Sequence, residues 1–294
     1  MRRFTQPITQ LANVSNMLQS MIAACERVFE FLEEDEEVPD TETPHSVKDI
    51  QGNVNFEHVK FGYNEDKIII KDFSAKIEQG KKIAIVGPTG AGKTTLVKLL
   101  MRYYDIGSGE IKIDGINIRD FKRDDLRSLF AMVLQDTWAF NETIMENIRY
   151  GNLDATDEEV IKAAKLAQVD HFVRTFPDGY NTVLNEDSTN ISQGQKQLLT
   201  IARAFLVDPK ILILDEATSS VDTRTEMQIQ KAMDELMKGR TSFVIAHRLS
   251  TVRNADLILV INEGDIVEQG THEELLEKGG FYEKLYNSQF EECG

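Results

Sequence analysis

Residues 82–95 read KIAIVGPTGAGKTT, and this stretch decides the fold. The apolar run KIAIV predicts a short buried strand, and the residues from Gly92 onward predict a helix. Between them, Gly87 to Thr94 fit the pattern G-x-x-x-x-G-K-[ST]. Gly87, Gly90 and Gly92 allow backbone conformations that turn successive N–H groups inward. These donors and the helix N-terminus together predict a nest for phosphate oxygens.

Two side chains of the loop and two carboxylates further along the chain predict triphosphate chemistry. Lys93 is placed to neutralise β- and γ-phosphates, and the Thr94 hydroxyl is placed to bind Mg²⁺. The apolar strand ILIL at 211–214 ends in Asp215 and Glu216. We expect Asp215 to hold Mg²⁺, directly or through water, and Glu216 to accept a proton from an attacking water.

The flanking chain alternates between strand and helix patterns, which predicts a mostly parallel sheet with helices on its faces. His247 ends an apolar run, at the sheet edge where open α/β sheets bind ligands. A polar, helical section is expected from about Asp120 to Arg174. Predicted strands, the first two antiparallel, are 53–61, 68–77, 82–86, 109–115, 211–214, 241–247 and 257–261.

Composition excludes several classes of protein. The 294 residues carry a net charge of −16. This charge argues against binding to nucleic acid, because a protein that binds a phosphate backbone needs a basic face. Cys25 and Cys293 are too few for a disulfide framework or a Cys-rich zinc site. No run approaches the roughly 18 apolar residues that span a bilayer.

The N-terminal region has its own organisation. Residues 4–32 carry apolar side chains spaced mostly by three and four, which predicts an amphipathic helix. An acidic run at 33–37 and two prolines, Pro39 and Pro44, predict a solvated linker. The compact domain is expected to begin near Ile50.

The stretch ISQGQ at 191–195, with the motifs above, makes the chain resemble the nucleotide-binding domain of ATP-binding cassette (ABC) transporters. The family signature is usually LSGGQ, and the resemblance covers roughly residues 50–290. It implies the ABC-ATPase type of P-loop NTPase fold. That fold has a mostly parallel α/β core sheet, an antiparallel β subdomain and a helical subdomain, here about 136–207.

The resemblance also implies roles for single residues around one ATP. Tyr63 matches the aromatic residue that stacks on adenine, and Gln135 matches the glutamine that reaches Mg²⁺ and the water. His247 matches the histidine that contacts the γ-phosphate, which makes it catalytic together with Glu216 and Gln135. The implied ATP-binding loop consists of Gly87, Pro88, Thr89, Gly90, Ala91, Gly92, Lys93, Thr94 and Thr95.

A second group of residues matches positions that act across a dimer. The resemblance implies that Ser192, Gln193, Gly194 and Gln195 bind the γ-phosphate of ATP held by the opposite subunit. A serine at this helix start would also cap the helix. Asp222 matches a loop residue that contacts the other subunit. Two such domains are then expected to pack head to tail around ATP, close with ATP and reopen after hydrolysis.

The N-terminal region narrows the expected class to an exporter at the cytoplasmic face of a membrane. Residues 1–32 resemble the end of the last membrane helix and connector, followed by the linker at 33–49. The alternative for 1–32 is an independent coiled-coil helix. The alternatives for the whole chain are an importer ATPase subunit and a soluble ABC-type ATPase.

Two places depart from the family pattern. Glu186 matches the acidic residue of the exporter's coupling segment, but Asp187 and Ser188 stand where Arg-Gly is usual. Ile191 and Gln193 depart from the usual signature. Such departures occur in heterodimeric exporters, in which one of the two ATP sites turns over poorly.

Overall fold

The computed structural model describes residues 2–34, 36–64, 67–134, 137–185, 190–215, 222–246 and 249–288. The described chain divides into two compact units, Met1–Pro39 and Asp40–Gly294. The following predicted residues lie outside the described ranges: Gln135, Glu186, Asp187, Ser188, Glu216, His247 and Cys293.

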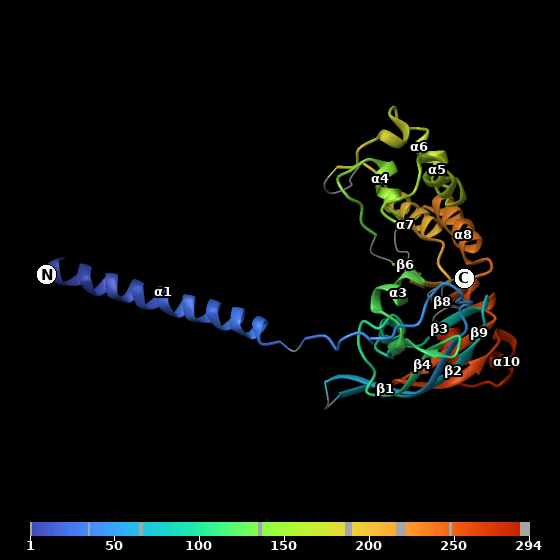
Figure 1. Cartoon of the computed structure of the whole chain (residues 1–294), viewed down its shortest axis with the longest axis horizontal. Coiled ribbons are helices and arrows are strands. Elements are labelled where there is room, and N and C mark those ends of the chain that lie inside the picture. The colour runs from blue at the N-terminus through green and yellow to red at the C-terminus, as the bar shows by residue number, and fades with distance from the viewer. Residues whose placement is uncertain are drawn as a thin grey trace. The chain divides into compact units, whose positions relative to one another are not determined.

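The first unit contains one long helix, α1, which covers Arg2–Leu32 (Figure 1). The sequence predicts a helix over 4–32 from the spacing of apolar side chains. Within the unit these apolar side chains remain exposed to solvent: Leu11 is 71% exposed and Phe29 is 59% exposed. No helix among the described residues combines the length and the apolar character needed to cross a membrane.

The second unit begins with an antiparallel sheet, sheet A, of strand order β2-β1-β4-β5. The two longest strands pair with Val54 opposite Ile77, and bulges interrupt the ladder after Phe56. The strands are β1 (Val54–Asn64), β2 (Lys67–Ile77), β4 (Ser108–Ile113) and β5 (Ile116–Asn117). The predicted antiparallel pair is therefore confirmed.

Sheet B forms the centre of the unit and has the strand order β10-β9-β3-β8-β7-β6. Five of its strands run parallel to one another, namely β9, β3, β8, β7 and β6, and β10 pairs antiparallel with β9 at one edge. The predicted mostly parallel core sheet is confirmed. Its strands are β3 (Lys82–Val86), β6 (Phe130–Val133), β7 (Ile211–Asp215), β8 (Thr241–Ile245), β9 (Leu257–Asn262) and β10 (Asp265–Gly270).

Side chains of sheet B alternate between two apolar layers, as the period of two along a strand requires. Ile211 and Ile213 of β7 pack with sheet A and helix α2. Leu212 and Leu214 face the opposite way and pack with helices α4, α5, α7 and α8. Both faces of the sheet are therefore covered, which explains why its strands are continuous apolar runs.

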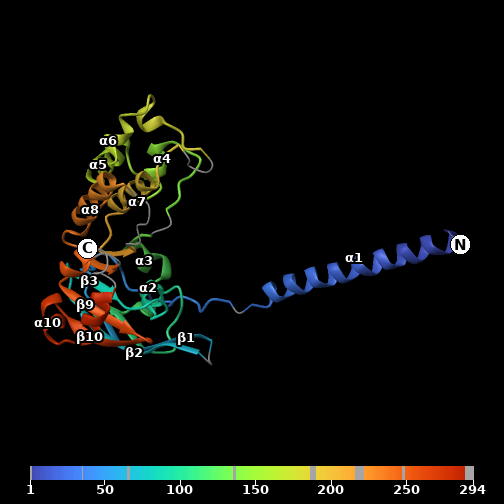
Figure 2. The same ribbon diagram turned by 180° about the vertical axis from the view of Figure 1, so that it is seen from behind.

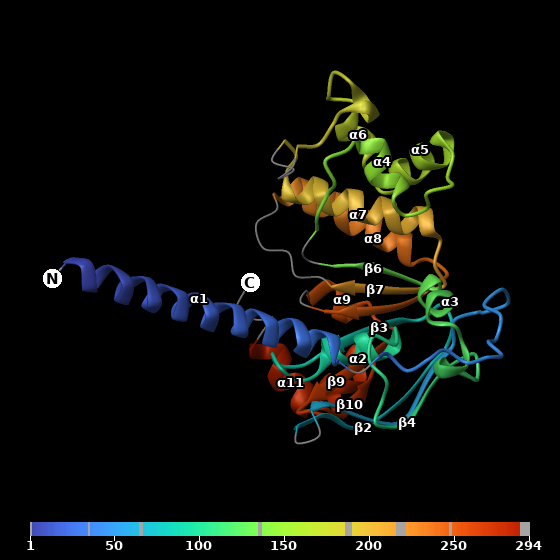
Figure 3. The same cartoon turned by 60° about the vertical axis from the view of Figure 1, so that its left-hand side comes forward.

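The helices lie on the two faces of sheet B (Figure 3). Helix α10 lies beside β10 at the antiparallel edge (Figure 2). The helices are α2 (Lys93–Leu100), α3 (Arg123–Ser128), α4 (Ile144–Arg149), α5 (Asp157–Leu166), α6 (Asp170–Val173), α7 (Gln193–Val207), α8 (Thr223–Met237), α9 (Leu249–Arg253), α10 (His272–Glu277) and α11 (Phe281–Tyr286), with short 3₁₀ turns at Ile118–Asp120 and Gly179–Asn181.

One sequence prediction is wrong. The section from Asp120 to Arg174 was expected to be helical, but Phe130–Val133 form β6, the edge strand beside β7. A run of only four residues carries no period that separates a strand from a helix. Pairing with the buried strand β7 decides the outcome.

Candidate functional site

The phosphate loop connects β3 to α2 and depends on its glycines. Gly90 has φ +83° and Gly92 has φ +102°, a region that side chains other than glycine rarely adopt. At Gly87 a Cβ atom would lie 2.1 Å from the carbonyl oxygen of Ile261 on β9. The loop can therefore follow this path only with glycine at these positions.

The N-terminus of α2 presents backbone donors to the same loop. Gly92 is the N-cap, and no side chain accepts a hydrogen bond there. The first amides of a helix have no partner within the helix and attract anions. Thr94 is exposed in this first turn, whereas Thr95 is buried. Thr89 and Gly90 are exposed at the tip of the loop, and Ala91 is buried beneath it.

The Lys93 side chain folds back over the loop. Its Nζ donates to the carbonyl oxygen of Gly87 at 2.7 Å and to that of Pro88 at 3.0 Å. Burial lowers the pKa of Lys93, and the nearby negative charge of Asp215 opposes this shift. Asp215 ends β7 and pairs in register with Ile245 of β8. The structure thus brings Lys93 and Asp215 to one edge of sheet B, as predicted from their positions after buried strands.

Tyr63 lies at the end of β1 and is 45% exposed. Its ring packs edge-on against Phe61 and Tyr104, each with centroids 5.0 Å away. Its hydroxyl lies 3.3 Å from Oγ1 of Thr95 on α2. A half-exposed aromatic ring is therefore fixed next to the helix that begins at the phosphate loop.

We expect Tyr63→Ala to weaken ATP binding about tenfold, because base–aromatic stacking contributes about 1–3 kcal/mol. Tyr63→Phe is the matched control, since it keeps the ring and removes only the contact with Thr95. Titration with a fluorescent ATP analogue measures both affinities. Equal affinity of Tyr63→Ala and the unchanged chain would remove Tyr63 from the binding site.

Ser192 begins helix α7 and caps it. The Gln195 amide donates to Ser192 Oγ at 3.2 Å, and the Ser192 amide donates to Gln195 Oε1 at 2.9 Å. Such a capping box satisfies two helix-end donors at once. Gln193 is exposed, and its Nε2 donates to Oγ1 of Thr137 at 3.3 Å, while Gly194 is buried. The predicted capping role of Ser192 is therefore present.

Asp222 begins helix α8 in the same way. Its Oδ1 accepts a hydrogen bond from the Thr225 amide at 3.0 Å, and this bond lowers the pKa of Asp222. Asp222 is exposed. The carboxylate is thus available at the surface in its charged form.

The phosphate loop and the ISQGQ segment lie on different sides of sheet B. Helix α2 packs in the layer that contains Ile213, whereas α7 packs in the layer that contains Leu214 (Figure 3). The structure therefore groups Tyr63, Lys93 and Asp215 but does not bring Ser192 to them within one chain.

Sequence reasoning missed a hollow of 320 Å³ lined by residues of β6, α7 and the chain near α4. The Arg203 guanidinium lies over the ring of Trp138 and donates to the Trp138 carbonyl oxygen at 3.0 Å. It also donates to the carbonyl oxygen of Asn147 at 2.7 Å. Trp138 is 54% exposed. Exposed aromatic residues at 138–150 give a weak signal, but their partner on α7 is too far along the chain to identify from the sequence.

Comparisons with known proteins show which family the chain belongs to. The family model described as "ABC transporter" matches residues 70–219. The chain is 56% identical, over 97% of its length and 45% of the relative's, to a fatty acid ABC transporter ATP-binding/permease protein of Mycobacterium bovis. It is 45% identical, over 96% of its length and 49% of the relative's, to an ATP-dependent lipid A-core flippase of Desulfotalea psychrophila.

A solved structure gives the same result. A bacterial Atm1-family ABC exporter with ATP bound matches with a TM-score of 0.82 and 38% identity, over 97% of this chain and 50% of that chain. The chain thus spans about half the length of the curated relatives that it matches.

Proposed function

Because this chain belongs to the ABC transporter family, with its ATPase fold, we propose that it is the ATP-hydrolysing motor of an exporter. The observation that carries the proposal is the shared sheet edge at which the phosphate loop, Lys93 and Asp215 meet. In this proposal the loop amides and Lys93 bind the β- and γ-phosphates, and Tyr63 stacks on adenine.

The residues present fit Mg²⁺ as a cofactor. Thr94 and Asp215 offer a hydroxyl and a carboxylate, and such hard oxygen ligands are those that Mg²⁺ prefers. Among the described residues there is no cluster of three or more acidic, His or Cys side chains that would hold a metal alone. Two protein oxygen ligands suffice for Mg²⁺, because this ion usually keeps several waters and binds substrate phosphates. When bound, Mg²⁺ would neutralise charge on the phosphates.

We assign the catalytic steps to residues next to this edge. Glu216 follows Asp215 directly, so its carboxylate is placed to take a proton from the attacking water. Gln135 would orient that water and would offer a further oxygen ligand to Mg²⁺, and His247 would contact the γ-phosphate. The support for these three roles is the family membership and their position just beyond β7, β6 and β8.

The separation of the phosphate loop from Ser192 supports a head-to-tail dimer. A signature that lies on the other side of its own sheet is available to the ATP of a second chain. We propose that Ser192, Gln193, Gly194 and Gln195 contact that γ-phosphate and that Asp222 contacts the second chain. The second chain is an identical or homologous nucleotide-binding domain.

The N-terminal region supports an exporter rather than an importer subunit. The matches to ATP-binding/permease relatives extend over 97% of this chain, so they include most of α1 and the linker. We propose that residues 1–32 join a transmembrane module and that residues 50–290 lie at the cytoplasmic face of its membrane. No observation here favours a soluble ABC-type ATPase.

Dimerisation around ATP gives a direct test of this function. We expect the chain to be monomeric without nucleotide and its ATP hydrolysis per molecule to rise with protein concentration. Ser192→Ala should remove this rise while ATP binding persists. Light scattering measures the oligomeric state, and phosphate release over a series of protein concentrations measures the rate of hydrolysis.

Thr156→Ala is the matched control, because Thr156 forms an equivalent capping box at the start of α5. Both substitutions remove a cap worth about 1 kcal/mol. If both changed hydrolysis equally, the loss would come from folding rather than from contact across the dimer. A tight dimer without nucleotide would contradict the proposal.

A further inference from the structure

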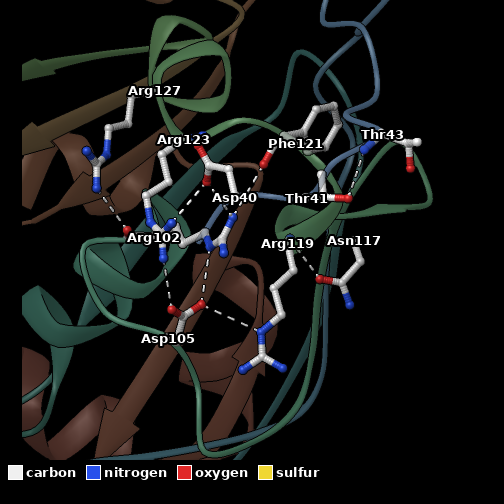
Figure 4. Close-up of polar contacts among 10 residues, drawn as sticks. All are labelled: Asp40, Thr41, Thr43, Arg102, Asp105, Asn117, Arg119, Phe121, Arg123 and Arg127. Carbon is white, nitrogen blue, oxygen red and sulfur yellow. Dashed lines mark hydrogen bonds and ion pairs between the residues drawn. The ribbon is translucent and has the colours of Figure 1, made fainter. Parts of the chain in front are cut away.

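An ionic cluster lies where the linker enters the second unit, and it contains Asp40, Arg102, Asp105, Arg119 and Arg123 (Figure 4). Arg123 donates to Asp40 twice, from Nη1 to Oδ1 at 3.0 Å and from its backbone amide to Oδ2 at 3.2 Å. Arg102 Nη1 lies 3.6 Å from the same Oδ1. The Asp40 carboxylate therefore holds two guanidinium groups that come from different parts of the chain.

Asp105 binds the same two arginines. Arg102 Nε donates to its Oδ1 at 3.2 Å, and Arg123 Nη2 donates to its Oδ2 at 3.1 Å. The side chains of Arg102 and Arg123 are only 3% and 7% exposed. Buried charges of this kind depend on their partners, and loss of one partner leaves an uncompensated charge. Arg119 adds a third cation, because its Nε lies 3.6 Å from Asp105 Oδ1, so three arginines share two aspartates.

The backbone at Arg102 adopts an unfavourable conformation that the contacts of its side chain help to offset. Arg102 follows the end of α2 with φ +52°, the left-handed conformation in which glycine is the usual residue after a helix. Its amide donates to the carbonyl oxygen of Leu99, so it closes the helix in glycine's place. A large residue in this conformation indicates that the side-chain contacts compensate for the backbone.

The two arginines lie at the far ends of two segments that reach the proposed active site. Arg102 closes α2, the helix that begins with Lys93 at the phosphate loop. Arg123 begins α3, which leads into β6, and β6 ends at Val133, shortly before Gln135. The Asp40 carboxylate therefore joins the far ends of two segments, one that begins with Lys93 and one that ends with β6 at Val133.

Asp40 is also the point at which the linker joins the catalytic unit. The chain divides into its two compact units between Pro39 and Asp40. Beyond Asp40 the chain is fixed: the His45 amide donates to the Asp120 carbonyl oxygen at 2.9 Å, and Ile50 is buried. The sequence predicts a solvated linker here, but the Asp40 side chain is only 29% exposed.

We propose that Asp40 is a positioning residue for ATP hydrolysis: it ties the linker across the ends of α2 and α3 and thereby sets α2, which begins with Lys93, relative to β6. The proposal rests on the proposed ATPase function.

Asp40→Asn in the full chain tests this, with Glu42→Gln as the matched control. Glu42 is an exposed acid two residues away in the same linker. We expect Asp40→Asn to lower kcat about threefold to tenfold while the ATP affinity stays within about twofold, as for residues that act through others. Hydrogen exchange at the Arg123 and His45 amides should accelerate in Asp40→Asn alone. Asp40→Glu, which keeps the charge, should recover most of kcat.

The outcomes separate this proposal from the proposed function. If the unchanged chain binds ATP but never hydrolyses it, at any protein concentration, the ATPase function fails. If it hydrolyses ATP and Asp40→Asn has the kcat of Glu42→Gln, the role of Asp40 is overturned, even where exchange accelerates. A fall in kcat that Asp40→Glu does not reverse also overturns it. A melting curve for each variant confirms that folded proteins are compared.

Discussion

Glu216→Gln is expected to bind ATP normally and to hydrolyse it about a hundredfold to ten-thousandfold more slowly, the range over which a general base acts. The amide keeps the shape of the side chain but does not accept a proton at neutral pH. Because the γ-phosphate then remains, two chains should stay closed around ATP. Phosphate release and light scattering with ATP measure the loss of turnover and the trapped dimer.

Glu277→Gln is a suitable control, because Glu277 is an exposed residue at the end of α10 on the same chain. This substitution makes the same change in charge and shape, but at a position away from the sheet edge where the parallel strands of sheet B end. Turnover of Glu216→Gln close to that of the control would remove Glu216 as the base. It would leave ATP binding at the phosphate loop untouched.

Lys93→Ala is expected to weaken ATP binding about a hundredfold or more, since a charged donor contributes about 1.5–3 kcal/mol for each hydrogen bond that it makes. In the structure Lys93 Nζ donates to the carbonyl oxygens of Gly87 and Pro88, so the ammonium group already lies over the loop. Burial lowers its pKa, and a bound phosphate would favour the charged form again. Titration with a fluorescent ATP analogue measures the loss.

The control for Lys93→Ala is Lys98→Ala, which removes the same charge from the last turn of the same helix. It separates local contact with phosphate from a general change in the charge of α2. We expect Lys98→Ala to bind ATP as the unchanged chain does. If Lys93→Ala also bound ATP with unchanged affinity, the phosphate loop would not be the nucleotide site.

The sequence predicts the centre of the fold well because several local signals agree there. The apolar run before Gly87 and the glycines that follow define β3, the loop and α2 together. Ser192 is likewise a predictable cap, since its partner Gln195 lies only three residues away. Local chemistry decides each of these features.

Features that depend on distant partners were not predictable. Strand β6 is too short to show a period, and its pairing with β7 makes it a strand. Asp40 belongs to an acidic, proline-containing stretch, and only folding brings it to Arg102 and Arg123. The same holds for Trp138 and Arg203. Arg203 lies on α7, and only folding brings its guanidinium over the Trp138 ring. The sequence contains these residues, but their pairing exists only in three dimensions.

The capping box at Ser192 has a consequence for how this surface can evolve. Aspartate and asparagine cap a helix about as well as serine does. Protein stability alone would therefore accept any of the three at position 192. An aspartate there would place a negative charge next to the γ-phosphate of the ATP that the second chain is proposed to hold. Selection for a serine at this position would therefore act on dimer formation. A mutation there would change the strength of association without changing the stability of each chain.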